Sequence, residues 1–365
     1  MTIYFILIFC VIFIPIFSAL FIKDSKNSKK VSLAILMFLL FLLFSLKSTS
    51  VGTDIIGYER MYDSFTNATW NNYDLYWTEW LYEFLEMIFT HILHVDFRTF
   101  LACIYAFLCY SYYRFIKNYS KDYQFSVLIY ICFTFMIFDM SAIRNLLAVA
   151  ICLFAFPYAE KKNDIKSTII FFLLTMIATQ VHSSAYIFLL VYFVIRYEIN
   201  VKTSFFYIIV PFLLIMFKGK VFSFINSYIK PISDPGSLYF GGNLFFMILI
   251  LSFTIIILLL LKKKKVDIKN NIQKEKSIID INVSMRLLYV AIFIQLFASE
   301  TILSRLSQFV QIFIIILLPN SVSLLDNRSK VIVKYLLYIF FIWYFWKFGL
   351  STNSLDVVPY KFYWQ

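Results

Sequence analysis

Long apolar runs separated by short polar segments make up most of the chain. A helix needs about 20 residues to cross the hydrocarbon core of a bilayer, and most of the runs approach that length. We therefore predict an all-α, polytopic integral membrane protein with about 12 transmembrane helices in a single membrane domain, residues 1–365. The predicted spans are 1–22, 31–47, 97–116, 123–140, 142–159, 166–180, 183–197, 203–218, 243–261, 286–303, 307–320 and 331–348.

Residues 79–95 are also fairly apolar, but their pattern is amphipathic. One helical face carries apolar residues: Trp80, Leu81, Phe84, Leu85, Ile88, Phe89, Ile92 and Leu93. The other carries mostly polar residues: Glu79, Glu83, Glu86 and Thr90. This pattern favours an amphipathic helix that lies in the interface of the outer leaflet. The alternative is that residues 79–95 form a thirteenth crossing. The basic residues Arg114, Lys117 and Lys121 near the end of the span 97–116 would then lie outside.

The composition supports lipid as the solvent of this chain. Hydrophobic residues make up 61% of the 365 residues and charged residues only 15%, against about 25% in soluble domains. A soluble protein cannot bury this much apolar surface, because its own surface must be wettable. A soluble globular enzyme and a disordered chain are therefore excluded. The five cysteines lie inside apolar runs, which excludes a secreted disulfide scaffold.

The basic residues determine the predicted orientation. The formal net charge is +12, and most of the 33 Lys and Arg residues lie in alternate loops. Because basic residues collect in cytoplasmic loops, we predict that these loops, including 262–285, are cytoplasmic and that both termini lie outside. The segments 48–96 and 217–242 are then the two large outer loops. Topology and attraction to anionic lipid explain the charge excess, so we expect no nucleic-acid partner.

Charged or titratable side chains near the outer ends of the spans are the candidates for chemistry, because polar groups at membrane depth are costly and usually functional. The candidates are Asp54, Arg98, Asp139, Arg144, His182, Glu300 and Arg305. Under the predicted topology all of them face the same side. The basic members break the positive-inside trend, which makes them the most informative residues in the chain.

Arg144, in the hairpin between the fourth and fifth predicted spans, and Arg305, between the spans 286–303 and 307–320, are candidate anion clamps. A guanidinium binds phosphate with two parallel hydrogen bonds. Each also has a structural alternative. Arg144 could pair with Asp139 or extend to the membrane interface, and Arg305 could pair with Glu300.

His182 is a candidate proton acceptor near neutral pH, although a lone histidine is as often a structural hydrogen-bonding group. Asp54 follows Gly52-Thr53 and could act as a base, a turn residue or a helix cap. The aromatic residues downstream, which include Tyr58, could stack on sugar rings or form an interfacial belt. The three histidines are too few and too scattered to predict a metal site.

Five short motifs, taken in order, resemble the EpsG-like branch of Wzy-type polysaccharide polymerases. They are Gly52-Thr53-Asp54 with Tyr58, the hairpin sequence Ala142 to Ala148 around Arg144, His182-Ser183-Ser184-Ala185, Arg305-Leu306-Ser307-Gln308-Phe309, and Pro359-Tyr360. Together they cover roughly residues 45 to 365. Two positions depart from the family pattern. Lys47 is the only basic residue offered where the family often has Arg before Gly-Thr-Asp, and Asn145 stands where it usually has Gln.

The resemblance implies a polymerase of the bacterial cytoplasmic membrane that acts at the outer face. Its substrates would be polyprenyl-diphosphate-linked oligosaccharide repeat units, joined into O-antigen, capsule or exopolysaccharide without a cofactor or metal. We expect Arg144 and Arg305 to hold the donor diphosphate, and His182 or Asp54 to act as the base. The supporting residues would be Tyr58, Arg98, Asp139 and Glu300. Flippase and chain-length regulator proteins would be partners.

Three other functions fit the same features. A flippase or exporter of lipid-linked oligosaccharide also suits twelve spans with buried arginines, but it predicts charges at several depths along a path. An O-antigen ligase or membrane acyltransferase would share the arginine and histidine chemistry at the outer face. A non-catalytic assembly partner would not need the cluster of candidates.

Overall fold

The fold is that of a computed structural model in which helices dominate. It describes residues 1–66, 79–161, 163–197, a few positions between 209 and 223, 241–263, 272–297 and 306–365. Within these ranges no strand is formed, and the one β-bridge pairs Lys47 with Phe362. The prediction of an all-α fold is therefore confirmed for the described part of the chain.

The helices follow one another closely along the sequence. Their bounds are α1 Thr2–Phe21, α2 Ser25–Ser45, α3 Ile55–Thr66, α4 Trp80–His91, α5 Phe97–Tyr119, α6 Tyr123–Cys132, α7 Phe135–Asp139, α8 Ile143–Glu160, α9 Ile165–Val181, η1 Ser183–Phe188, α10 Leu189–Arg196, α13 Gly241–Lys263, α14 Ile272–Phe297, α15 Gln308–Gln311, α16 Ile314–Ser323, α17 Asn327–Tyr344 and η4 Phe345–Leu350.

Six helical segments within the described residues are long and apolar enough to cross a membrane: Thr2–Phe21, Ser25–Ser45, Phe97–Tyr119, Ile143–Glu160, Leu244–Leu261 and Asn327–Leu350. Five shorter apolar helices accompany them: Tyr123–Cys132, Ile165–Val181, Ser183–Arg196, Ile281–Phe297 and Gln308–Ser323. The chain is thus a multi-pass membrane protein. The predicted span 203–218 lies mostly outside the described residues, as does the end of 286–303.

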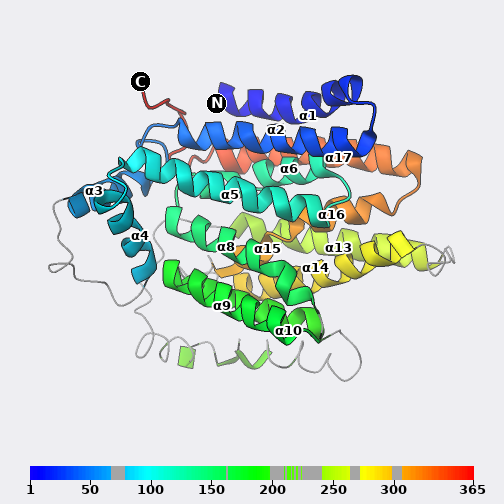
Figure 1. Cartoon of the computed structure of the whole chain (residues 1–365). Helices are drawn as coiled ribbons and strands as arrows, with labels where there is room; N and C mark the ends of the chain where they lie inside the picture. Colours follow the sequence, from blue (N-terminus) through cyan, green and yellow to red (C-terminus); the bar gives the residue numbers. More distant parts are fainter. Residues whose placement is uncertain are drawn as a thin grey trace.

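The helices form a layered bundle with an aromatic core. In Figure 1, α1, α2, α5, α8 and α9 follow one another down the molecule, with α13, α14 and α17 beside them. Helix α8 packs on both α5 and α9, and α6 packs on α16 and α17. The rings of Phe115, Phe156 and Phe313 meet at centroid distances of 4.8 to 5.9 Å, which joins α5, α8 and the start of α16.

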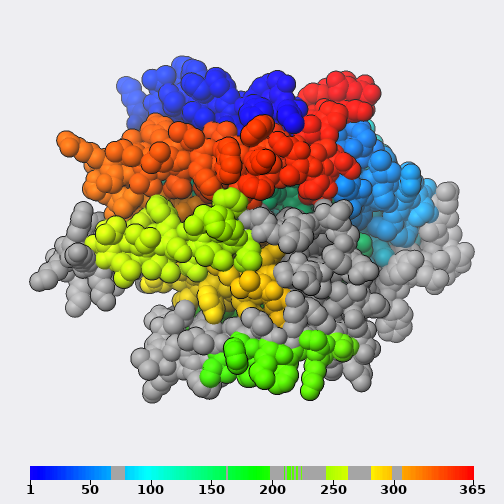
Figure 2. Space-filling model, turned by 180° about the vertical axis from the view of Figure 1, so that it is seen from behind, coloured from blue at the N-terminus to red at the C-terminus, as the bar shows by residue number. Residues whose placement is uncertain are grey.

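The outer surfaces of α1, α13 and α17 are apolar. Phe9 on α1, Leu259 on α13 and Ile339 on α17 are 56%, 60% and 68% exposed. Figure 2 shows α1, α17 and α13 stacked on one face of the molecule. Exposed apolar surface this extensive would drive a soluble protein to aggregate, whereas it matches the hydrocarbon core of a bilayer.

A proline inside α1 ties this helix to α6. Pro15 has no N–H group and so cannot donate to the carbonyl of Val11, four residues earlier. Gln124 at the start of α6 replaces the missing donor, because its Nε2 donates to the carbonyls of Val11 at 3.0 Å and Ile12 at 3.2 Å. The side-chain amide of Gln124 is therefore paired with the carbonyl group that Pro15 leaves without a backbone donor.

Both ends of the chain meet at the end of the bundle that carries α3 and α4. The hydroxyl of Tyr4 donates to the carbonyl of Val357 at 2.7 Å, and Tyr360 donates to the carbonyl of Leu43 at 2.7 Å. The amide of Gly52 donates to the carbonyl of Asp356 at 3.1 Å. The carboxy-terminal segment thus covers the Gly52 turn and the start of α1.

Helix α4 turns its polar face toward the protein. Glu83, Glu86 and Thr90 are buried, while Trp80 and Phe84 are 38% and 36% exposed. Twelve residues give α4 a length of about 18 Å, against about 30 Å for the hydrocarbon core of a bilayer. Glu79 is the N-cap residue of α4, and its backbone lies in the left-handed region at φ 76°.

Candidate functional site

A carboxylate at the start of α4 joins two of the predicted residues. Glu79 is only 4% exposed. Its Oε2 accepts a hydrogen bond from Nη1 of Arg144 at 2.8 Å. Its Oε1 lies 2.8 Å from Nδ1 of His182 and accepts bonds of 3.0 Å from both the amide and the hydroxyl of Ser183. One buried side chain therefore contacts the hairpin arginine and the histidine motif at the same time.

The antiparallel packing of α8 and α9 explains why these motifs meet. Arg144 is the second residue of α8, and His182 follows the last residue of α9. Because α8 packs along α9, the start of one lies beside the end of the other. A further hydrogen bond joins α4 to α9, because Nε1 of Trp80 donates to Oε1 of Gln180 at 2.7 Å.

The surroundings of Glu79 keep it ionised. Burial by itself would raise the pKa of this carboxyl. The contacts with His182 and Ser183, together with the positive charge of Arg144, outweigh burial and lower the pKa of Glu79 from 4.5 to about 2. Glu79 is therefore a fixed negative charge at neutral pH. Arg144 and His182 keep 33% and 21% of their side-chain surface exposed, so both remain accessible from outside the bundle.

The Gly-Thr-Asp motif docks on the turn that precedes the hairpin arginine. The hydroxyls of Thr53 and Ser141 lie 2.8 Å apart, and the amide of Asp54 donates to Oγ of Ser141 at 3.3 Å. Gly52 makes this approach possible. Its φ is +105°, and a Cβ here would lie 2.6 Å from the carbonyl oxygen of Met140.

Tyr58 connects this motif to the arginine. Nε of Arg144 donates to its hydroxyl at 3.4 Å, and the guanidinium carbon lies 5.5 Å from the centre of its ring. Tyr58 begins the second turn of α3, four residues after Asp54. The structure therefore gathers Arg144, His182, Tyr58 and Asp54 around one end of the bundle, with Glu79 between the first two.

Asp139 is not part of this cluster. Its Oδ2 accepts hydrogen bonds from Tyr130 at 2.7 Å and from Tyr112 at 3.4 Å, and it is 4% exposed. The alternative in which Arg144 pairs with Asp139 is therefore wrong, because Glu79 is the ion-pair partner of Arg144.

The remaining predicted residues separate into two groups. The guanidinium of Arg98 stacks 3.5 Å above the ring of Tyr363 in the carboxy-terminal segment. Glu300 and Arg305 lie outside the described residues. The end of the Arg305 motif is described, however: Oε1 of Gln308 accepts a hydrogen bond from Nδ2 of Asn145 at 3.1 Å. Asn145, one of the departures from the family pattern, thus binds the motif that Arg305 opens.

Two acidic residues, Glu79 at the N-cap of α4 and Glu86 within it, were not identified as candidates from the sequence. Glu79 holds the cluster together, and Glu86, seven residues later, is fully buried. Burial raises the pKa of Glu86 to about 9, so this carboxyl is neutral at pH 7. The available signal was the spacing of Glu79, Glu83 and Glu86, which places three carboxyls on one helical face opposite an exposed tryptophan.

The comparisons with known proteins agree with the motifs. The family model described as EpsG family matches residues 30–362, which include every residue of the cluster. No curated protein and no solved structure matches the chain.

Proposed function

The chain belongs to the EpsG family of Wzy-type polysaccharide polymerases and exopolysaccharide biosynthesis proteins, and we propose that it polymerises polyprenyl-diphosphate-linked oligosaccharide repeat units. The reaction would take place at the outer face of the bacterial cytoplasmic membrane, with both termini on that side. The product would be a surface polysaccharide.

The observation that carries this proposal is the bridge formed by Glu79. It holds a cation, Arg144, and a proton acceptor, His182, at one end of the bundle, and both are partly exposed. Glycosyl transfer from a diphosphate carrier needs these two groups together. One stabilises the leaving phosphate, and the other takes a proton from the attacking hydroxyl.

Arg144 is the proposed diphosphate clamp. As the bond between the sugar carbon and the diphosphate oxygen breaks, negative charge grows on the diphosphate, and a fixed guanidinium stabilises it. Among the described residues, Nη1 and Nε of Arg144 contact Glu79 and Tyr58, which leaves the Nη2 group to bind phosphate. Arg305 would supply a second clamp, since its motif reaches Gln308 beside Asn145.

His182 is the proposed base. With Nδ1 facing the Glu79 carboxylate, the ring proton would sit on that nitrogen and Nε2 would be free to accept another. The acceptor hydroxyl would lose its proton to Nε2 while its oxygen forms the new glycosidic bond. The polyprenyl diphosphate then leaves, and the proton passes to solvent. Asp54 is the other candidate base, placed nearby by the contact between Thr53 and Ser141.

The test is complementation of a strain that lacks the gene. Arg144→Ala and His182→Ala should each remove the ladder of long polymer on gels and leave single repeat units on the carrier. The matched controls are Arg60→Ala and His94→Ala, two exposed residues near the same end of the bundle. Full-length ladders from both site variants, at the protein level of the wild type, would contradict the proposal.

The gene deletion also separates the other candidate functions. A polymerase deletion leaves single repeat units on the carrier or its acceptor. A flippase deletion leaves the repeat units on carrier in the inner leaflet, so the acceptor at the outer face stays undecorated. A ligase deletion leaves long polymer that stays on the carrier.

A further inference from the structure

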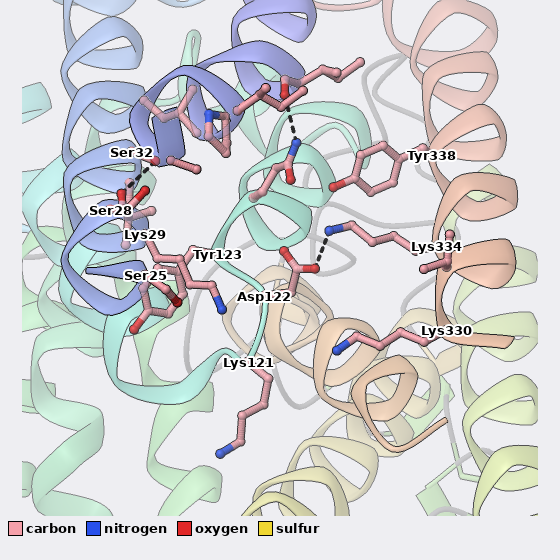
Figure 3. A pocket seen from close by; sticks show the side chains of 18 of the residues that line it. Ser25, Ser28, Lys29, Ser32, Lys121, Asp122, Tyr123, Lys330, Lys334 and Tyr338 are labelled. Carbon is pink, nitrogen blue, oxygen red and sulfur yellow. Dashed lines mark hydrogen bonds and ion pairs between the residues drawn. The ribbon is translucent and has the colours of Figure 1, made fainter. Parts of the chain in front are cut away.

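A pocket at the end of the bundle away from the cluster around Glu79 is lined by lysines from three separate segments. It has a volume of about 520 Å³ and lies between α1 and α2 on one side and α17 on the other, with α6 as its floor (Figure 3). Its basic lining residues are Lys29, Lys121, Lys330 and Lys334. The start of α2 is separated from the Gly52 turn by the length of α2, about 30 Å, so this pocket is distinct from the candidate functional site.

The lining carries an excess of positive charge. The lining contains four lysines and one carboxylate, Asp122, which gives it a net charge of +3. Lys334 forms an ion pair with that carboxylate. Within the described ranges, the ammonium groups of Lys29, Lys121 and Lys330 have no carboxylate within ion-pair distance. Figure 3 shows the ammonium groups of Lys29 and Lys330 on either side of the hollow, whereas Lys121 points away from Asp122 at its rim. The like charges of Lys29 and Lys330 repel each other, and an anion between them would reverse this repulsion.

The buried hydroxyl of Tyr338 also lies inside the pocket (Figure 3). Tyr338 is 5% exposed, and its hydroxyl finds no hydrogen-bond partner in the part of the chain that the structure describes. Figure 3 shows this hydroxyl pointing away from α17 toward α6, beside the ion pair of Asp122 and Lys334. A buried polar group without a partner is costly, and an anion in the pocket would accept this hydrogen bond.

The walls above the lysines are apolar and face outward. Ile16 on α1 and Val331 and Tyr335 on α17 line the pocket and are 53%, 52% and 63% exposed. Figure 2 shows that α1 and α17 adjoin on one face of the molecule. The pocket therefore offers cations and a hydroxyl donor at its base and hydrocarbon-like surface at its sides.

We propose that this pocket binds the phosphate headgroup of an anionic phospholipid of the surrounding bilayer, with the acyl chains along α1 and α17. Basic pockets between transmembrane helices on the cytoplasmic side recognise such headgroups, and the volume is within the range of about 300–1,000 Å³ of ligand sites. This inference does not depend on the proposed polymerase activity.

The experiment is native mass spectrometry of the full-length protein in detergent with added dioleoyl phosphatidylglycerol. The test variant is Lys29→Gln with Lys330→Gln. Its matched control is Lys26→Gln with Lys166→Gln, which removes the same charge from exposed lysines outside the pocket. Each lysine near an anionic lipid contributes about 1 kcal/mol, so the pocket variant should bind phosphatidylglycerol on the order of 25-fold more weakly. The control should change the affinity by less than about twofold.

A conservative variant guards against effects on folding. Tyr338→Phe removes only the unpartnered hydroxyl, so the protein should melt at the same or a higher temperature without lipid. Its affinity for phosphatidylglycerol should fall about fivefold, the loss of one hydrogen bond of about 1 kcal/mol. Equal losses in the pocket and control variants would overturn the proposal. Equal affinity for the zwitterionic lipid phosphatidylcholine would also overturn it. If inorganic phosphate displaced the lipid at similar concentrations, the pocket would be a site for a soluble anion, and the lipid proposal would be wrong.

Discussion

Nη1 of Arg144 donates to Oε2 of Glu79 at 2.8 Å, across 65 residues of sequence. The same carboxylate contacts His182, so a single acidic residue sets the distance between the proposed phosphate clamp and the proposed base. The shared partner also implies that the two groups respond together when Glu79 is changed.

Replacement of Arg144 should lower polymer formation strongly. Removal of one preorganised donor to a developing negative charge costs about 100-fold or more in rate, and we expect a loss of that size for Arg144→Ala. Arg144→Lys keeps the positive charge, but a lysine ammonium lacks the planar fork of donors that lets a guanidinium contact Glu79 and a phosphate at the same time. Its activity should therefore be intermediate. Initial rates measured at equal protein levels check this, and Arg60→Ala should retain full activity.

The ion pair of Glu79 should make stability depend on acid pH. Folding lowers the pKa of Glu79 from 4.5 to about 2, so its stabilising contribution is complete above pH 4.5 and is lost as the pH falls toward 2. At pH 7, Glu79→Gln should reduce the free energy of unfolding by about 2 kcal/mol. Melting temperatures at a series of pH values should show this difference shrink below pH 4.5. A difference that stays constant down to about pH 3 would contradict the assignment, and Asp63→Asn on exposed α3 serves as the control.

Glu86 should have the opposite effect on stability. Burial raises its pKa to about 9, so between pH 4.5 and 9 the folded state must hold a proton that the unfolded state has released. Stability attributed to Glu86 therefore falls as the pH rises through this range. Glu86→Gln removes this penalty, and its melting temperature should exceed that of the wild type by more at pH 8 than at pH 5. An equal gain at both pH values would show that the carboxyl does not titrate in this range.

Two glycines provide a matched pair for the Gly-Thr-Asp turn. Gly52→Ala places a Cβ 2.6 Å from the carbonyl oxygen of Met140 at a φ of +105°, which should cost about 1–3 kcal/mol and reduce polymer formation. Gly57 lies in α3, and a Cβ added there would meet no atom within 4 Å, so Gly57→Ala should be neutral or stabilising by up to about 1 kcal/mol. Thermal melting and polymer ladders distinguish the two, and equal behaviour would exclude a specific role for the turn.

The pattern of apolar runs was sufficient to predict a multi-pass helical membrane protein, because the length of a run follows directly from the thickness of the bilayer. The topology predicted from the loop charges places Asp54, Arg144 and His182 on one side of the membrane. Their individual partners were not predictable. Asp139 is closer to Arg144 in sequence than Glu79, yet its hydrogen bonds come from Tyr112 and Tyr130.

The orientation of α4 shows why the key carboxylate was missed. An amphipathic pattern identifies two faces, but it does not state which face meets the protein when the surrounding solvent is lipid. In α4 the apolar residues Trp80 and Phe84 are exposed, and the acidic residues Glu83 and Glu86 are buried. Glu79 continues that buried acidic face, so its role depended on tertiary packing against Arg144 and His182.

The most direct measurement uses the purified full-length protein in liposomes, supplied with lipid-linked repeat units extracted from a strain that lacks the gene. The wild type and His94→Ala should yield long polymer and free polyprenyl diphosphate, and His182→Ala should yield neither product. Polymer of normal length and rate from His182→Ala and Arg144→Ala would show that the cluster around Glu79 is not the polymerase site.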